Sequence, residues 1–261
     1  MRRPAVAGYF YPSNPESLLA MLREFADKRS DEDVVAIVSP HAGYVYSGRT
    51  AGAVHSLLPD VETYVIIGPN HTGLGAAVAV SYDDWMTPIG VVETDREFID
   101  AMPKKICVVD EIAHREEHSL EVQVPFLQYL HKDFKIVAIC MGLQDKETAE
   151  EIVEEILEAQ EITGRRIALV ASSDMHHYLP DDECRRRDEI VIEAILSMDV
   201  DKYYNTIYKL QASVCGYGPI AVAMLYSKEL GAKAELVHYS TSGDVADRSQ
   251  VVGYAGIAFR V

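Results

Sequence analysis

Histidine is the residue type whose placement in this sequence points most directly to chemistry. The chain has 9 histidines, and four of them, His41, His71, His176 and His177, closely follow segments that we predict to be β-strands. Imidazole nitrogens bind transition metals and exchange protons near neutral pH. Gly and Pro residues around His41 and His71 restrict the loops that carry them. The pattern therefore predicts a metal site with acid/base groups at one edge of a sheet.

Cysteine offers one further candidate ligand. The four cysteines share no CxxC spacing, and Cys107 and Cys140 stand in apolar runs that are typical of buried packing residues. Cys215 instead lies in a loop-like stretch just ahead of a predicted helix, where a helix N-terminus lowers a thiol pKa and favours the thiolate. The sequence leaves open whether Cys215 is a ligand or a buried packing residue.

A separate motif, His114-Arg115-Glu116-Glu117-His118, matches the HxxEH spacing of inverted zinc peptidases. On a helix, this spacing would place two imidazoles on one face with a base between them. We predict that the helix begins only near Ser119, so the match is expected to be accidental. His118 alone stays a candidate for the site, and a zinc hydrolase is the alternative.

Short β-branched segments alternate with longer amphipathic ones along the chain. Strands are predicted at Val34–Val38, Thr63–Ile67, Ala76–Val80, Gly90–Glu93, Phe134–Met141, Arg166–Ser172, Glu235–Ser240 and Val251–Arg260. Helices are predicted at Ser47–Leu58, Asp95–Ala101, Leu120–Leu130 with a kink or late start at Pro125, Lys146–Gln160, Asp182–Leu196, Asp201–Leu210 and Pro219–Leu230.

This alternation predicts an α/β fold with a mixed, mainly parallel central sheet flanked by helices on both faces. Ligands of such sheets bind beyond the carboxyl ends of the strands. The length of 261 residues and the lack of a Gly/Ser/Pro linker favour one domain over residues 1–261.

Charge and hydropathy exclude several classes of partner. The chain has 24 Lys and Arg against 41 Asp and Glu, a formal charge of −17, which argues against nucleic acid and against an anionic membrane surface. No apolar stretch approaches the roughly 18 residues of a membrane span. With no disulfide framework, we expect a soluble, cytoplasmic protein.

Six stretches, in order along nearly the whole chain, resemble the Memo family, cytoplasmic proteins named for mediating ErbB2-driven cell motility. They are Ala7-Gly8-Tyr9-Phe10-Tyr11-Pro12, Pro40-His41-Ala42-Gly43-Tyr44, Gly68-Pro69-Asn70-His71, Glu117-His118-Ser119-Leu120-Glu121, Ser172-Ser173-Asp174, and Cys215-Gly216 with Pro219-Ile220. The Memo fold is similar to that of class III extradiol dioxygenases, which open catechol rings with Fe(II) and O₂.

The resemblance implies a role for each matched position. The family's metal-binding residues correspond to His41, His71 and Cys215, and its catalytic acid/base corresponds to His177. Further pocket positions correspond to His118, Asp174, Phe10 and Tyr46. Asp174, three residues before His177, is expected to hold the second nitrogen of that imidazole, and His176 is the alternative to His177.

One departure from the dioxygenase pattern affects the expected chemistry. The dioxygenases use two histidines and a carboxylate, whereas Cys215 stands at the third position here. A thiolate favours iron or copper, with zinc as the alternative. We expect either a metal-dependent oxidoreductase, whose small-molecule substrate the sequence does not name, or a non-catalytic module that binds a metal or a peptide in the same cleft.

Overall fold

A β-sheet of eleven strands forms the centre of the computed structural model, which describes residues 1–27 and 29–261. In chain order the strands are β1 (Val34–Ser39), β2 (Thr63–Pro69), β3 (Val78–Val80), β4 (Trp85–Thr87), β5 (Gly90–Thr94), β6 (Val108–Val109), β7 (Lys135–Met141), β8 (Ile167–Ser172), β9 (His177–Leu179), β10 (Lys233–Thr241) and β11 (Val251–Arg260).

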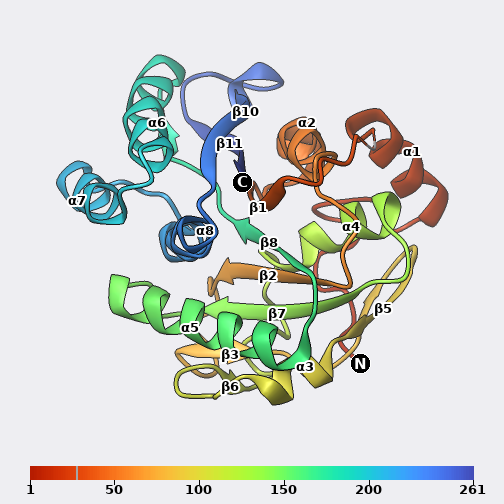
Figure 1. The fold of residues 1–261 in the computed structure, drawn as a ribbon. Helices are drawn as coiled ribbons and strands as arrows, with labels where there is room; N and C mark the ends of the chain where they lie inside the picture. The colour runs from red at the N-terminus through yellow and green to blue at the C-terminus, as the bar shows by residue number, and fades with distance from the viewer. Residues whose placement is uncertain (28) are drawn as a thin grey trace.

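The main path through the sheet has the order β10-β11-β1-β8-β2-β7-β3-β6 (Figure 1). The four central strands β1, β8, β2 and β7 are mutually parallel. The prediction of a mainly parallel sheet is only partly right, because β11 runs antiparallel to β1 and β10, and β3 runs antiparallel to β7. Only nine residues, 242–250, join β10 to β11, too few for the crossover that a parallel pair would need.

Helices cover both faces of this sheet (Figure 1). Those of the described residues are α1 (Pro15–Phe25), α2 (Tyr44–His55), α3 (Arg96–Ala101), α4 (Val124–Leu130), α5 (Lys146–Thr163), α6 (Asp181–Leu196), α7 (Val200–Leu210) and α8 (Tyr217–Glu229), with 3-10 turns η1 (Glu121–Gln123) and η2 (Ser242–Asp244). Side chains of α3, α5, α6, α7 and α8 pack on one face, and those of α2 and α4 pack on the other. None of the described helices is long and apolar enough to cross a membrane.

The central strands are apolar without interruption because both of their faces are buried. In β2, Tyr64 and Ile66 pack toward α2 and α4, whereas Val65 and Ile67 pack toward α5 and α8. All four side chains are fully buried. This burial holds the ends of the central strands in fixed register, which is what a site beyond those ends requires.

One helix is absent from the sequence-based expectation, and another begins earlier than expected. Helix α1 was not predicted, although Asn14 caps it by accepting a hydrogen bond from the Ser17 N–H, and Pro15 stands in its first turn. Helix α2 begins at Tyr44 rather than Ser47, with Gly43 at its N-cap. Tyr46 therefore lies on the first turn of a helix and not in the preceding loop.

Candidate functional site

The carboxyl ends of β1, β8 and β2 meet at one edge of the sheet. Ser39 lies opposite Ser172, and Ile67 lies opposite Ala171. His41 follows the end of β1 by two residues, and His71 follows the end of β2 by two residues. The parallel register therefore brings the two histidines to the same place, as the strand-end rule predicts.

His41, His71 and Cys215 form one cluster at this edge. Their nearest nitrogen and sulfur atoms all lie within 4.8 Å of one another. The Cys215 Sγ is 3.2 Å from the His41 Nε2, and the two imidazole rings lie edge to face with centroids 5.1 Å apart. His41 is buried, whereas His71 is exposed, so the cluster opens toward solvent on the His71 side.

Close packing at the start of α8 places Cys215 in this cluster. A Cβ atom at Gly216 would lie 2.4 Å from the Ser172 carbonyl oxygen, so only glycine allows so close an approach to β8. The Gly216 N–H donates to the Ser173 Oγ, and the Asp174 N–H donates to the Cys215 Sγ at 3.2 Å. Both contacts tie the cysteine to the loop that follows β8.

The expectation of a helix-acidified thiol at Cys215 is wrong. Burial raises the pKa of the Cys215 thiol above its usual range, and the neighbouring Asp174 carboxylate raises it further. The desolvation of the sulfur therefore favours the neutral thiol. A cation at the sulfur is what would favour the thiolate in this setting.

Glu117 also lies at this cluster, although in the sequence it stands out only as part of the HxxEH match and of one Memo-like stretch. One carboxylate oxygen lies 2.8 Å from the His71 Nδ1, and the carboxylate also accepts the backbone N–H groups of His71, His118 and Ser119. Burial alone would raise the pKa of Glu117, but the His71 hydrogen bond and the other donors bring it down to about 2. A carboxylate in this position holds the proton on Nδ1 and leaves the His71 Nε2 free for a metal.

His118 lies over the two candidate histidine ligands. Its ring stacks on that of His71 with centroids 4.5 Å apart, and it meets the His41 ring edge to face at 5.3 Å. Burial lowers the pKa of His118 to about 4, against the opposing charge of Glu117. Together with His71 and Glu117, it forms a second cluster of candidate ligands.

The two aromatic residues expected to line the cleft occupy different positions. The Phe10 ring contacts His118 with centroids 4.7 Å apart. Tyr46 is 45% exposed on the first turn of α2 and lies beside Gly43. Phe10 therefore forms part of the wall next to the histidines, whereas much of the Tyr46 side chain faces solvent.

His177 does not have the partner that the sequence suggested. Its Nδ1 lies 2.8 Å from the Ser213 carbonyl oxygen, which only accepts hydrogen bonds. The proton is therefore on Nδ1 and the lone pair on Nε2. The expectation that Asp174 holds the second nitrogen is wrong, because β9 pairing places the imidazole against the segment before Cys215.

Asp174 instead supports His41. One carboxylate oxygen accepts the His41 backbone N–H at 2.8 Å, and the other lies 4.0 Å from the His41 Nε2. Burial raises the pKa of Asp174 to about 6, although the hydrogen bond from His41 opposes the shift. Burial also lowers the pKa of His41 well below its usual range, and the neighbouring His118 and His71 lower it further.

The remaining histidines of interest have partners elsewhere. The buried His176 lies with its Nδ1 2.7 Å from the Asp188 carboxylate on α6. His114 is buried against Trp85, and its Nε2 donates to the Ala79 carbonyl oxygen. The 114–118 segment is not helical, so the HxxEH spacing does not bring His114 and His118 onto one helix face.

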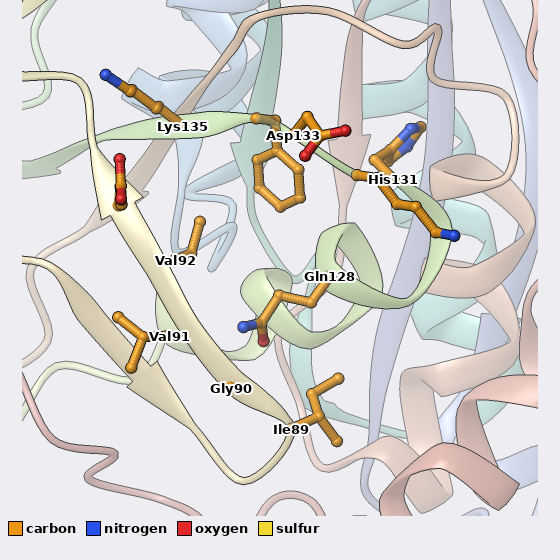
Figure 2. Close-up of a pocket in the computed structure, with 11 residues that line it drawn as sticks. Ile89, Gly90, Val91, Val92, Gln128, His131, Asp133 and Lys135 are labelled. Atoms are coloured by element: carbon orange, nitrogen blue, oxygen red, sulfur yellow. The ribbon is translucent and has the colours of Figure 1, made fainter.

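A cavity of about 540 Å³ is lined by none of the residues of this cluster. Figure 2 shows the residues that line it. Ile89, Val91, Gln128, His131 and Lys135 are among the residues that line it. Lys135 is the first residue of β7, so the cavity lies at the amino end of a central strand. The candidate ligands stand at the opposite edge of the sheet.

The chain has relatives of the same length among known proteins. The family described as Memo-like protein matches residues 2–258. The chain is 75% identical to a MEMO1 family protein of Archaeoglobus fulgidus over the whole of both chains. It is 49% identical to a MEMO1 family protein of Methanosarcina barkeri, over 98% of this chain and 99% of the relative. On these grounds, the chain belongs to the Memo family.

Proposed function

We propose that His41, His71 and Cys215 bind one metal ion, and that the cleft around it serves a metal-dependent oxidoreductase. The observation that carries the proposal is the approach of three ligand atoms of suitable chemistry to within 4.8 Å of one another. A small shift of each side chain would bring all three to about 2.0–2.3 Å from a common centre.

The donor set fits such an ion. Two imidazoles and one thiolate suit iron or copper, and they also suit zinc. The Glu117 carboxylate against the His71 Nδ1 is the outer partner that metal-binding histidines commonly have. When bound, the ion would supply Lewis-acid or redox chemistry to a molecule in the cleft.

The other residues of the cleft have roles that follow from their protonation. His177 presents an Nε2 lone pair while the Ser213 carbonyl holds its Nδ1 proton, so it can accept a proton from a bound substrate. Asp174 holds the His41 loop, and His118 and Phe10 form an aromatic wall. These groups suit a small phenolic substrate, in line with the likeness of the Memo fold to catechol-opening dioxygenases.

A non-catalytic function is the second candidate. Tyr9 is 88% exposed beside Phe10, and Tyr46 is 45% exposed on α2. Exposed aromatic side chains of this kind are typical of surfaces that bind a peptide or another protein. The cleft would then bind a metal or a peptide without catalysing a reaction.

The test is metal analysis of the protein purified from its own source without added metal or chelator, followed by oxygen-uptake assays with a panel of catechols. Iron or copper near one equivalent together with oxygen uptake supports the oxidoreductase. A bound metal with no uptake favours the binding module. Absence of a stoichiometric metal contradicts the proposal.

A further inference from the structure

We propose that the Ser172 hydroxyl is a positioning group that fixes the proton of His41 on Nδ1, and that Gln123 holds this hydroxyl in its accepting role. The proposal rests on the proposed metal site, since it explains how one ligand is prepared for the ion. The residues concerned are Ser172 of β8, which contacts the His41 Nδ1, and Gln123 of η1, which contacts Ser172.

The Ser172 hydroxyl has three close polar neighbours. Its Oγ lies 2.6 Å from the Ser119 carbonyl oxygen, 2.8 Å from the Gln123 Nε2 and 2.9 Å from the His41 Nδ1. A hydroxyl has one proton to donate and two lone pairs that accept. Because a carbonyl oxygen only accepts, the single proton of Ser172 goes to Ser119, and the other two neighbours must both donate.

The orientation of the Gln123 amide follows from its surroundings. The end assigned as Nε2 lies 3.0 Å from the Pro40 carbonyl oxygen, which requires a donor there. The opposite end, Oε1, lies 2.8 Å from the His55 Nε2. The NH₂ group therefore faces both Pro40 and Ser172, and it takes one of the two lone pairs of the serine oxygen.

One lone pair of Ser172 is left, and it can only accept the proton of His41 Nδ1. His41 is then the Nδ1–H tautomer, and its Nε2 presents a lone pair toward the Cys215 Sγ at 3.2 Å. That nitrogen can bind a metal without a change of tautomer. A neutral hydroxyl does for His41 what the Glu117 carboxylate does for His71.

Burial leaves the groups of this network no water molecules as alternative hydrogen-bond partners. Ser172 and Gln123 are fully buried, and so is His55 at the far end of the chain of hydrogen bonds. A buried donor that loses its partner costs about 1–3 kcal/mol, because water does not replace the missing acceptor. The tautomer of His41 is therefore determined by groups on three different elements, β8, η1 and α2.

The direct test is the tautomer of His41 in the metal-free protein. Two-bond ¹H–¹⁵N NMR correlations distinguish Nδ1–H from Nε2–H histidine, and the His41→Gln variant assigns the signal. We expect the Nδ1–H form in the wild-type protein. A predominant Nε2–H form would overturn the proposal, and this measurement requires no variant other than the one used for assignment.

Ser172→Ala removes the acceptor and should shift His41 toward the Nε2–H tautomer. Metal affinity should fall about 10- to 100-fold, the usual effect of losing an outer partner of a ligand. Ser81→Ala is the matched control, because Ser81 is also a fully buried serine with two hydrogen bonds, to Trp85 and Glu111. It should leave both the tautomer and the affinity unchanged.

The readouts separate the two proposals. Wild-type protein that binds no metal but shows the Nδ1–H tautomer would contradict the metal site and leave the role of Ser172 standing. A Ser172→Ala variant that keeps the wild-type tautomer and metal affinity would contradict the role of Ser172 and leave the metal site standing. Equal losses in the Ser172→Ala and Ser81→Ala variants would reduce the effect to stability and overturn the proposal.

Discussion

At the scale of single residues, the sequence best predicted the candidate ligands that directly follow a strand. The placement of His41 and His71 at one edge of the sheet could be predicted, because each closely follows an apolar segment that reads as a strand in the sequence. Glu117 was not singled out as a site residue, because only the folded segment after β6 brings its carboxylate to His71. The Ser213 carbonyl against His177 is likewise a contact between distant segments that no local pattern indicates.

His177→Ala should separate metal binding from turnover. The imidazole carries its proton on Nδ1 and a lone pair on Nε2, so its loss removes a base but no proposed ligand. With a catechol that supports oxygen uptake, we expect a rate lower by roughly 10²- to 10⁴-fold and an unchanged metal content. Unchanged uptake would refute the acid/base role and make His176 the next residue to test.

Metal content of variants at His71, inside the cluster, and at His114, outside it, tests which histidines bind the metal. His71→Ala should abolish stoichiometric metal binding, because His71 is in both clusters of candidate ligands. His114→Ala should leave the metal content unchanged, because that imidazole donates to Ala79 and packs against Trp85. Metal analysis of the two purified variants decides the matter, and equal loss in both would restore the zinc-peptidase alternative.

At the scale of elements, most strands and helices could be predicted from hydrophobic periodicity, with boundaries that differ by a few residues. The short strands β4, β6 and β9 could not, since two or three residues carry too little pattern. The antiparallel margins of the sheet were also missed, because strand direction depends on connections and partners rather than on the strand itself.

Gly216 tests how the start of α8 is held against β8. A Cβ there would meet the Ser172 carbonyl oxygen at 2.4 Å, so Gly216→Ala must push Cys215 away from the histidines. We expect the free energy of unfolding to fall by about 1–3 kcal/mol and the metal affinity to fall with it.

Gly164→Ala is the control for this variant. Gly164 ends α5 with a φ of 65° and has nothing within 4 Å of its added Cβ. The substitution should cost about 1 kcal/mol of stability from backbone strain and leave metal affinity unchanged. Chemical denaturation and metal titration of both variants give the comparison, and intact metal affinity in Gly216→Ala would show that α8 does not position Cys215.

At the scale of the whole molecule, several histidines are buried in their neutral form. Burial lowers the pKa of His55 and of His114 to about 4, even though each donates a hydrogen bond to an oxygen, which opposes the shift. The unfolded chain titrates near 6.5. Between these two values the unfolded state binds protons that the folded state excludes, so the contribution of these histidines to stability falls as the pH falls.

The predicted loss is up to ~1.4 kcal/mol per pH unit for each such histidine between about pH 6.5 and pH 4. Urea unfolding at pH 7 and at pH 5 measures it. His114→Gln keeps a donor for the Ala79 carbonyl but does not titrate, so the variant should lose less stability over the same interval. A loss equal to that of the wild-type protein would show that His114 does not contribute to the acid sensitivity.

X-ray absorption spectroscopy on the natively purified protein tests the central claim most directly, because it identifies the metal and its ligand atoms together. The account predicts one bound ion with one sulfur and at least two nitrogen neighbours at about 2.0–2.3 Å. In the Cys215→Ser variant, the sulfur contribution should disappear. A metal shell made only of nitrogen and oxygen in the wild-type protein would contradict the assignment of His41, His71 and Cys215 to one site.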